Sequence, residues 1–271
     1  MSASNFPEQV RGMLMSVSRD PIEMEQYMDF LKNRSFRQTL LCRYEVALER
    51  TAQFRQLAHL RVASQSRPET EIVDVTSKQS VKFLNGRGTL TTSDPVMKAA
   101  LIHLKRIWPA SVPFVELVSL AQSTATGRAT ALDSKVMSSA TESLAETFLR
   151  CFATATIDLR RSAPRFAEQI SDKPHATALT RAQAVRGPRV TSRLHEIVTI
   201  DDIQRQVVAA CDGQHSASEL IEVLCDVVQN GDLILHHDGR RITDRESAHK
   251  LTSEAIPPIL RALAQRALLI G

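Results

Sequence analysis

Apolar residues near the N-terminus recur three and four residues apart, first up to Leu31 and then over residues 40–48. This spacing is typical of helices that bury one face. Asp20 precedes the first run and is a good N-cap, because its carboxylate can accept from the free N–H groups of a first turn. The pattern predicts a helical N-terminal segment over residues 1–62.

Two later regions alternate helical runs with short strand signals. Residues 63–164 contain a glycine-bearing hairpin pattern, a helix opened by Asp94, two more helical runs and a short strand at 154–159. Residues 196–271 contain helices opened by Asp201 and Ser216, a hairpin centred on Asp-Gly and a last helix from about residue 253 to 264. Three helices with a small hairpin predict a winged-helix-like module in each region.

Residues 165–195 lie between the two regions and have few large apolar residues. The segment carries two prolines and several arginines, and it has no long periodic run. Such a composition favours a linker. The predicted fold class is therefore mainly α with small β elements: a helical N-terminal segment and two winged-helix-like modules joined by a basic linker.

The two modules share an order of elements that indicates an internal repeat. Residues 115–118 align with residues 218–221, so that Glu116 falls on Glu219. Leu149 and Arg150 align with Leu260 and Arg261 in the last helix of each module. The spacing between these two alignments differs, which places a length change between them.

The composition is that of an ordinary globular protein, with 43% hydrophobic and 24% charged residues and a net charge of +4. The four cysteines have no metal-ligand spacing, and we expect them to be buried thiols in a reducing compartment. The first residues lack the pattern of a secretory signal, and no apolar stretch is long enough to span a membrane. These features predict a cytoplasmic protein.

The chain has none of the local signatures of common enzymes. Gly86 and Gly88 are followed by a strand pattern, whereas a nucleotide- or AdoMet-binding turn leads from a strand into a helix. His236 and His237 are neighbours on a predicted strand, so their rings point to opposite faces and do not converge on a metal. We therefore expect no catalytic, cofactor-binding or metal-binding residues, no bound cofactor, and a protein that is not an enzyme.

A basic joint between the two N-terminal helical runs is the best candidate for a binding surface. Arginine pairs with carboxylates in bidentate fashion, and an aromatic side chain among arginines supplies an apolar anchor. A solvated connection between two helices is the alternative interpretation. The predicted partner-binding residues are Lys32, Arg34, Phe36, Arg37 and Arg43.

Winged-helix modules raise DNA binding as a competing function. The third helix of each module would then read the major groove, and it would need several basic residues to neutralise phosphates. The two candidates carry Glu142, Glu146 and Glu254 beside few arginines, and Pro257 and Pro258 interrupt the last helix. Nucleic acid is therefore the less favoured partner.

Taken together, these motifs resemble a known family. Residues 25–43 resemble the signature of the regulatory domain of a group of bacterial methyltransferases, and the stretch from Trp108 to Leu117 is similar to its following region. Asp212-Gly213 with Glu219-Leu220 resembles the C-terminal winged-helix-like domain of outer-membrane-protein lysine methyltransferases.

In that family these segments follow an AdoMet-dependent catalytic domain and regulate it or hold its protein substrate. The glycine-rich AdoMet loop has no counterpart in this sequence, so the resemblance carries over no catalytic residue. It implies a regulatory or substrate-presenting protein whose partner is a separate AdoMet-dependent methyltransferase or its protein substrate. The alternative is the C-terminal fragment of a split or truncated methyltransferase.

Overall fold

The computed structural model describes residues 6–36, 41–47, 54–86, 88–127, 139–163, 167, 169–237 and 240–270. The chain separates into two compact units, residues 1–50 and 51–271. The described residues are mainly α-helical with short antiparallel strands, which confirms the predicted fold class.

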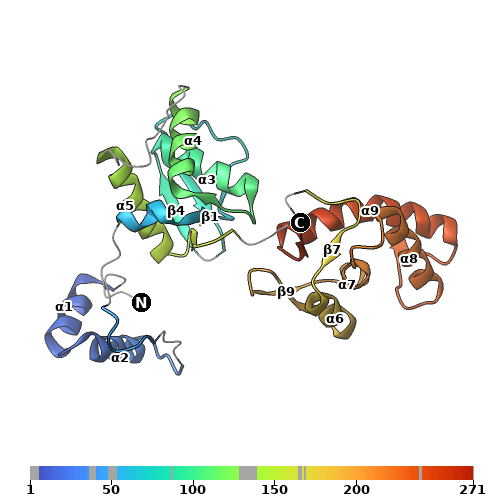
Figure 1. The fold of residues 1–271 in the computed structure, drawn as a ribbon, viewed down its shortest axis with the longest axis horizontal. Helices are drawn as coiled ribbons and strands as arrows, with labels where there is room; N and C mark the ends of the chain where they lie inside the picture. The colour runs from blue at the N-terminus through green and yellow to red at the C-terminus, as the bar shows by residue number, and fades with distance from the viewer. Residues whose placement is uncertain are drawn as a thin grey trace. The chain divides into compact units, whose positions relative to one another are not determined.

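The N-terminal unit is built from two helices, α1 (Glu8–Val17) and α2 (Pro21–Leu31) (Figure 1). The Asp20 carboxylate accepts from the N–H groups of Ile22 and Glu23, so the predicted cap is present. The second predicted helical run is wrong over residues 41–47, which are not helical. The part of this unit that the structure describes buries only two large apolar side chains, Leu14 and Met28.

The other unit begins with a first module, residues 54–163, which packs three helices against two small sheets (Figure 1). One sheet has the order β5-β1-β6 and the other has the order β2-β3-β4. Phe114 and Phe148 meet edge to face in the core, with ring centroids 5.6 Å apart. The elements are η2 (Phe54–His59), β1 (Arg61–Ala63), β2 (Arg67–Pro68), β3 (Val81–Leu84), β4 (Thr89–Thr92), α3 (Pro95–Ile107), β5 (Val112–Pro113), α4 (Phe114–Thr126), α5 (Ser139–Ala153) and β6 (Asp158–Arg160).

The second module, residues 167–270, has its own apolar core between four helices. Its strands form the pairs β12-β7, β8-β9 and β10-β11. Ser216 and Glu219 form a reciprocal capping box at the start of α8. The elements are β7 (His175–Ala176), α6 (Ala178–Arg186), β8 (Arg189–Thr191), β9 (Ile197–Thr199), α7 (Asp202–Ala210), α8 (Ala217–Gln229), β10 (His236–His237), β11 (Arg240–Arg241), α9 (Arg245–Gln265) and β12 (Leu269–Ile270).

The two modules repeat one topology. In each, a first strand lies in the middle of a small sheet: β1 between β5 and β6, and β7 between β12 and a bridge from His175 to Asp212. A hairpin follows, β3-β4 or β8-β9, and then a helix capped by Asp94 or Asp201. The helices α3, α4 and α5 thus correspond to α7, α8 and α9.

Burial fixes the register of this repeat. The buried residues Ala100, Leu101 and Leu104 of α3 fall on Val207, Val208 and Cys211. The predicted pairing of Glu116 with Glu219 holds, because each is the third residue of its helix.

The predicted alignment of the last helices is wrong by one residue. Phe148 and Cys151, which are buried, correspond to Leu260 and Leu263. Ala155 and Ala267, each two residues beyond the end of its helix, both have positive φ.

Two predicted domain borders do not coincide with the elements. A border at residue 62 would cut β1, the central strand of the first module's sheet. The predicted linker at 165–195 contains β7, α6 and β8, and Ala176, Ala184 and Val190 belong to the core of the second module.

The last helix is also longer than predicted, since α9 begins at Arg245 and continues through Pro257 and Pro258. Both prolines are exposed, so the carbonyl groups that they leave without a donor can bind water.

Three of the four cysteines are buried thiols, as predicted, and Cys42 is exposed, which the sequence analysis did not expect. Burial raises the pKa of Cys151 to about 11. Burial and the nearby Asp212 carboxylate raise the pKa of Cys211 to about 12. These two thiols are therefore protonated near neutral pH and packed as small apolar side chains.

A buried lysine joins α3 to the loop between β2 and β3. Lys98 has no exposed surface, and its ammonium group donates to the carbonyl oxygens of Asp74, Ser77 and Gln79 at 3.1, 2.5 and 3.3 Å. An ammonium group has three hydrogens to donate. The three backbone acceptors therefore match its capacity, and the loop is held to the helix by one side chain.

Candidate partner-binding surface

Where the structure describes it, the N-terminal unit exposes most of its large apolar side chains. Phe30 is 79% exposed on α2, and Phe36, Leu41 and Tyr44, which follow the helix, are more than 90% exposed. So many exposed large apolar residues in one short segment are typical of a site that binds another molecule. The exposed set in this unit is Met13, Met15, Val17, Ile22, Phe30, Leu31, Phe36, Leu41, Tyr44 and Val46.

Three of the predicted binding residues lie directly after α2. Lys32 is the C-cap of the helix, and its ammonium group lies 5.1 Å from the centre of the Phe6 ring. Arg34 pairs with the Asp29 carboxylate at 3.7 Å. Phe36 is 93% exposed.

The other two predicted residues are Arg37 and Arg43. Arg43 is exposed, and its carbonyl oxygen accepts from the N–H of Val46. Arg37 lies outside the described residues. The role of the five residues in binding stays a prediction.

The ion pair between Arg34 and Asp29 changes the expected chemistry of this surface. Asp29, Phe30 and Arg34 line a hollow of about 520 Å³ together with Gln26, Asn33 and Ser35. A basic and an acidic group thus flank one exposed aromatic ring. The described part of the surface is more apolar and less basic than the sequence indicates.

The apolar residues around Phe30, Leu41 and Tyr44 are the part that sequence reasoning missed. Their helical spacing predicted a buried face, and the structure exposes it. A signal was present in the length of the segment, because so short a unit buries too little surface to stabilise itself alone. A short unit with many large apolar residues predicts a partner as well as a helix.

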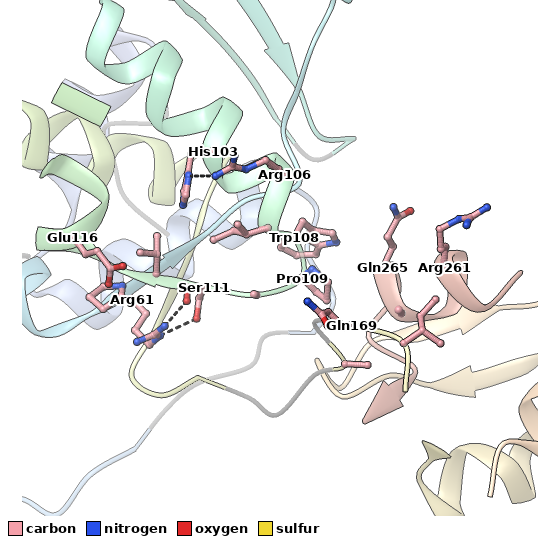
Figure 2. Close-up of a pocket in the computed structure, with 17 residues that line it drawn as sticks. Arg61, His103, Arg106, Trp108, Pro109, Ser111, Glu116, Gln169, Arg261 and Gln265 are labelled. Atoms are coloured by element: carbon pink, nitrogen blue, oxygen red, sulfur yellow. Dashed lines mark hydrogen bonds between the residues drawn. The ribbon is translucent and has the colours of Figure 1, made fainter. Parts of the chain in front are cut away.

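A second, polar surface lies on the first module around Trp108 (Figure 2). Arg61 Nε donates to Ser111 Oγ at 3.1 Å, and His103 Nδ1 lies 3.2 Å from a guanidinium nitrogen of Arg106. Burial and the nearby Arg106 charge lower the pKa of His103, so this ring is neutral at pH 7. The Ser111 hydroxyl faces an arginine here rather than a general base, so this pair is not a nucleophile with its activating base.

Trp108 lies at the end of α3 and contacts an arginine of β6. The ring is half-buried, and the Arg160 guanidinium lies 5.4 Å from its centre. Arg160 also donates to the carbonyl oxygen of Pro109 at 2.7 Å. These contacts are structural: they attach β6 to the end of α3.

The described residues do not assemble a metal site. No three His, Cys, Asp or Glu side chains among them are placed to hold an ion together. Gly86 and Gly88 lie at the turn of the β3-β4 hairpin, so this glycine pair joins two strands and is not the entry to a helix. Within the same residues, the helices are all too short or too polar to span a bilayer.

Comparison with known families is informative at both ends of the chain. Residues 172–268 match the family model of the PKMT C-terminal winged helix domain. Residues 1–43 match the predicted methyltransferase regulatory domain. The chain is therefore similar to methyltransferase-related domains at both ends. Both matches confirm the resemblance drawn from the sequence, and the regulatory match covers the exposed apolar residues of the N-terminal unit up to Leu41.

Individual relatives extend the comparison over the whole chain. The protein is 26% identical over its full length to the uncharacterized protein RP789 of Rickettsia prowazekii (strain Madrid E) and covers 49% of it. It is 22% identical over 90% of its length to the uncharacterized protein RP027 of the same organism, which is covered completely.

Two solved structures of PKMT2 from Rickettsia typhi, one of them in complex with AdoHcy, have a similar fold. The TM-score is 0.79 at 20% identity, with 98% of this chain and 53% of that chain covered. The chain therefore spans about half the length of RP789 and of PKMT2.

Proposed function

We propose that this protein is a non-catalytic regulatory or substrate-presenting partner of a separate AdoMet-dependent protein methyltransferase. The N-terminal unit contacts the methyltransferase, and the two modules serve regulation or substrate binding. The observation that carries this proposal is the exposure of Phe30, Phe36 and Leu41 inside the segment that matches a methyltransferase regulatory domain, with Tyr44 exposed directly after it.

The relatives support a partner of this kind. PKMT2, whose complex with AdoHcy has been solved, has about as much chain outside the matched part as inside it. RP027 is matched over its full length, so a related chain of similar size occurs as a separate protein. That relative favours an accessory protein over the alternative of a fragment of a split enzyme.

Affinity capture with the tagged full chain tests the proposal. Lysate from the source organism is passed over the chain, and bound proteins are cross-linked to radiolabelled AdoMet by ultraviolet light. The wild type retains an AdoMet-binding protein. The combined change Phe36→Ser, Leu41→Ser and Tyr44→Ser reduces this retention at least tenfold, because the partner loses three apolar anchors.

Ile72→Ser is the matched control, since Ile72 is 92% exposed and lies in the other unit. This control retains the partner at the wild-type level, and circular dichroism of both variants keeps the helix signal. Capture of no AdoMet-binding protein by the wild type would refute the proposal. Equal capture by the triple variant would contradict the proposed contact between the N-terminal unit and the methyltransferase.

The predicted basic residues are tested in the same assay. Arg37→Ala reduces capture without a change in helicity if this position contacts the partner. Full retention by Arg37→Ala together with Arg43→Ala would limit the surface to its apolar residues.

Two other functions give different results in solution. Calorimetry of the chain with AdoMet gives no binding heat under this proposal, and a saturable isotherm would make the chain itself an AdoMet-binding protein. Duplex DNA gives no steeply salt-dependent binding under this proposal. A binding constant that falls with salt as steeply as several phosphate contacts require would favour the nucleic-acid alternative.

A further inference from the structure

The short helix α6 of the second module turns its apolar side to solvent. Its inner side buries only Thr180 and Ala184. The opposite side is exposed, with Leu179 at 59% and Val185 at 69%. This outer stripe consists of Ala178, Leu179, Ala182, Val185 and Arg186, which succeed one another at helical spacing.

Polar contacts hold α6 in this orientation. The Thr180 hydroxyl donates to the carbonyl oxygen of Thr191 at 3.0 Å, and Gln183 exchanges two hydrogen bonds with the same residue. Arg205 of α7 donates to the carbonyl oxygens of Ala184 and Val185 at the end of the helix. The outer stripe is thus preformed, and a partner would not need to order it.

The segment that carries the stripe is strongly basic. Between residues 173 and 195 the sequence has no Asp or Glu and five basic residues. Arg186 lies within the stripe, and Arg189 is exposed at the start of β8, three residues beyond it. A complementary partner would therefore be acidic as well as apolar.

We propose that the outer face of α6 binds an acidic, apolar segment of another protein. A protein segment fits better than nucleic acid, because four of the five stripe residues are apolar and a phosphate backbone offers them no contact. Leu179 and Val185 contact the apolar side of the segment, and Arg186 and Arg189 pair with its carboxylates. This binding uses the second module alone, so it does not depend on the proposed methyltransferase contact.

The test measures fluorescence anisotropy of labelled peptides with the full chain. The probe is an 18-residue amphipathic peptide with Leu on one helical face and Glu elsewhere. Its counterpart has Lys in place of Glu, and a third probe is a 20-base-pair duplex DNA. The acidic peptide binds at least tenfold more tightly than the basic peptide, and added salt weakens it.

Variants separate the two components of the surface. Leu179→Ser with Val185→Ser weakens binding of the acidic peptide at least tenfold, and Arg186→Glu with Arg189→Glu does the same. Ile234→Ser is the control, because Ile234 is also an exposed apolar residue of this module. It leaves the dissociation constant within twofold of the wild type.

Three results would overturn the proposal. The first is no preference for the acidic peptide. The second is unchanged binding by the Leu179 and Val185 variant. The third is tighter binding of the duplex DNA than of the acidic peptide, with the duplex binding lost in the Arg186 and Arg189 variant and kept in the Leu179 and Val185 variant. That result would assign the surface to nucleic acid.

Discussion

Replacing Lys98 by methionine should destabilise the first module and release its β2-β3 loop. The substitution keeps an unbranched apolar side chain of similar length in the buried position, so it leaves little cavity. It removes the ammonium group that donates to three backbone carbonyl oxygens. Hydrogen bonds to charged groups contribute roughly 1.5–3 kcal/mol each in mutational series.

Two effects reduce that sum. The carbonyl oxygens belong to Asp74, Ser77 and Gln79, which are not buried, so water can replace the lost donor. Burial of an ammonium group also costs free energy, which the methionine avoids. We expect a net loss of about 2 kcal/mol in the free energy of unfolding. With a urea m-value of about 2 kcal/mol/M, the midpoint falls by about 1 M.

The single tryptophan makes the assay specific. Trp108 lies in the first module and is the only one in the chain, so its fluorescence follows urea unfolding of this module. Amide hydrogen exchange over residues 70–80 reports on the loop and should accelerate in the variant. A midpoint within 0.2 M of the wild type would refute this reasoning, since the buried charge would then cost as much as its hydrogen bonds contribute.

Three further substitutions test local features of the modules. Gly88→Ala places a Cβ 2.4 Å from the carbonyl oxygen of Thr154 and should cost about 1–3 kcal/mol by tryptophan fluorescence. Gly187→Ala in the second module meets no atom within 4 Å, so it should leave the urea midpoint followed by circular dichroism unchanged. Ser216→Ala removes a capping hydrogen bond and should lower the stability of the second module by about 1 kcal/mol in urea titrations followed by circular dichroism.

The Asp212 carboxylate accepts hydrogen bonds from the backbone N–H of Gln214 and from the His215 ring. These bonds hold the pKa of the carboxyl group well below its usual range. Its stabilising contribution is therefore present above about pH 4 and decreases as the pH falls, so Asp212→Asn should reduce stability at pH 6 and flatten the loss of stability between pH 4 and 2.5. An unchanged pH profile would contradict this.

Local signals in the sequence predicted the starts of helices and the turns of hairpins. Asp94, Asp201 and Ser216 were recognised as caps because the groups that they satisfy lie within three residues along the chain. The β3-β4 pairing was likewise visible, since its strands are joined by a short glycine-bearing turn. Such features depend on neighbouring residues and need no knowledge of the rest of the fold.

Features that depend on distant contacts were not predictable in this way. The helix α6 was read as linker because its sequence is basic and weakly apolar, and it is fixed by Thr191 and Arg205 from other elements. The exposure of Phe30 could not be predicted from the sequence for a similar reason. Apolar residues have the same helical spacing whether their face packs within the chain or binds a second molecule.

The shared topology of the two modules has a consequence for their order of folding during synthesis. In each small sheet the strand made first occupies the middle, and one edge is supplied by the last strand of the module, β6 or β12. The sheet around the central strand is therefore complete only after about a hundred further residues have been synthesised. During that interval its free edges are open to wrong pairing, and a chaperone that binds short extended segments would act on β1 and β7 first.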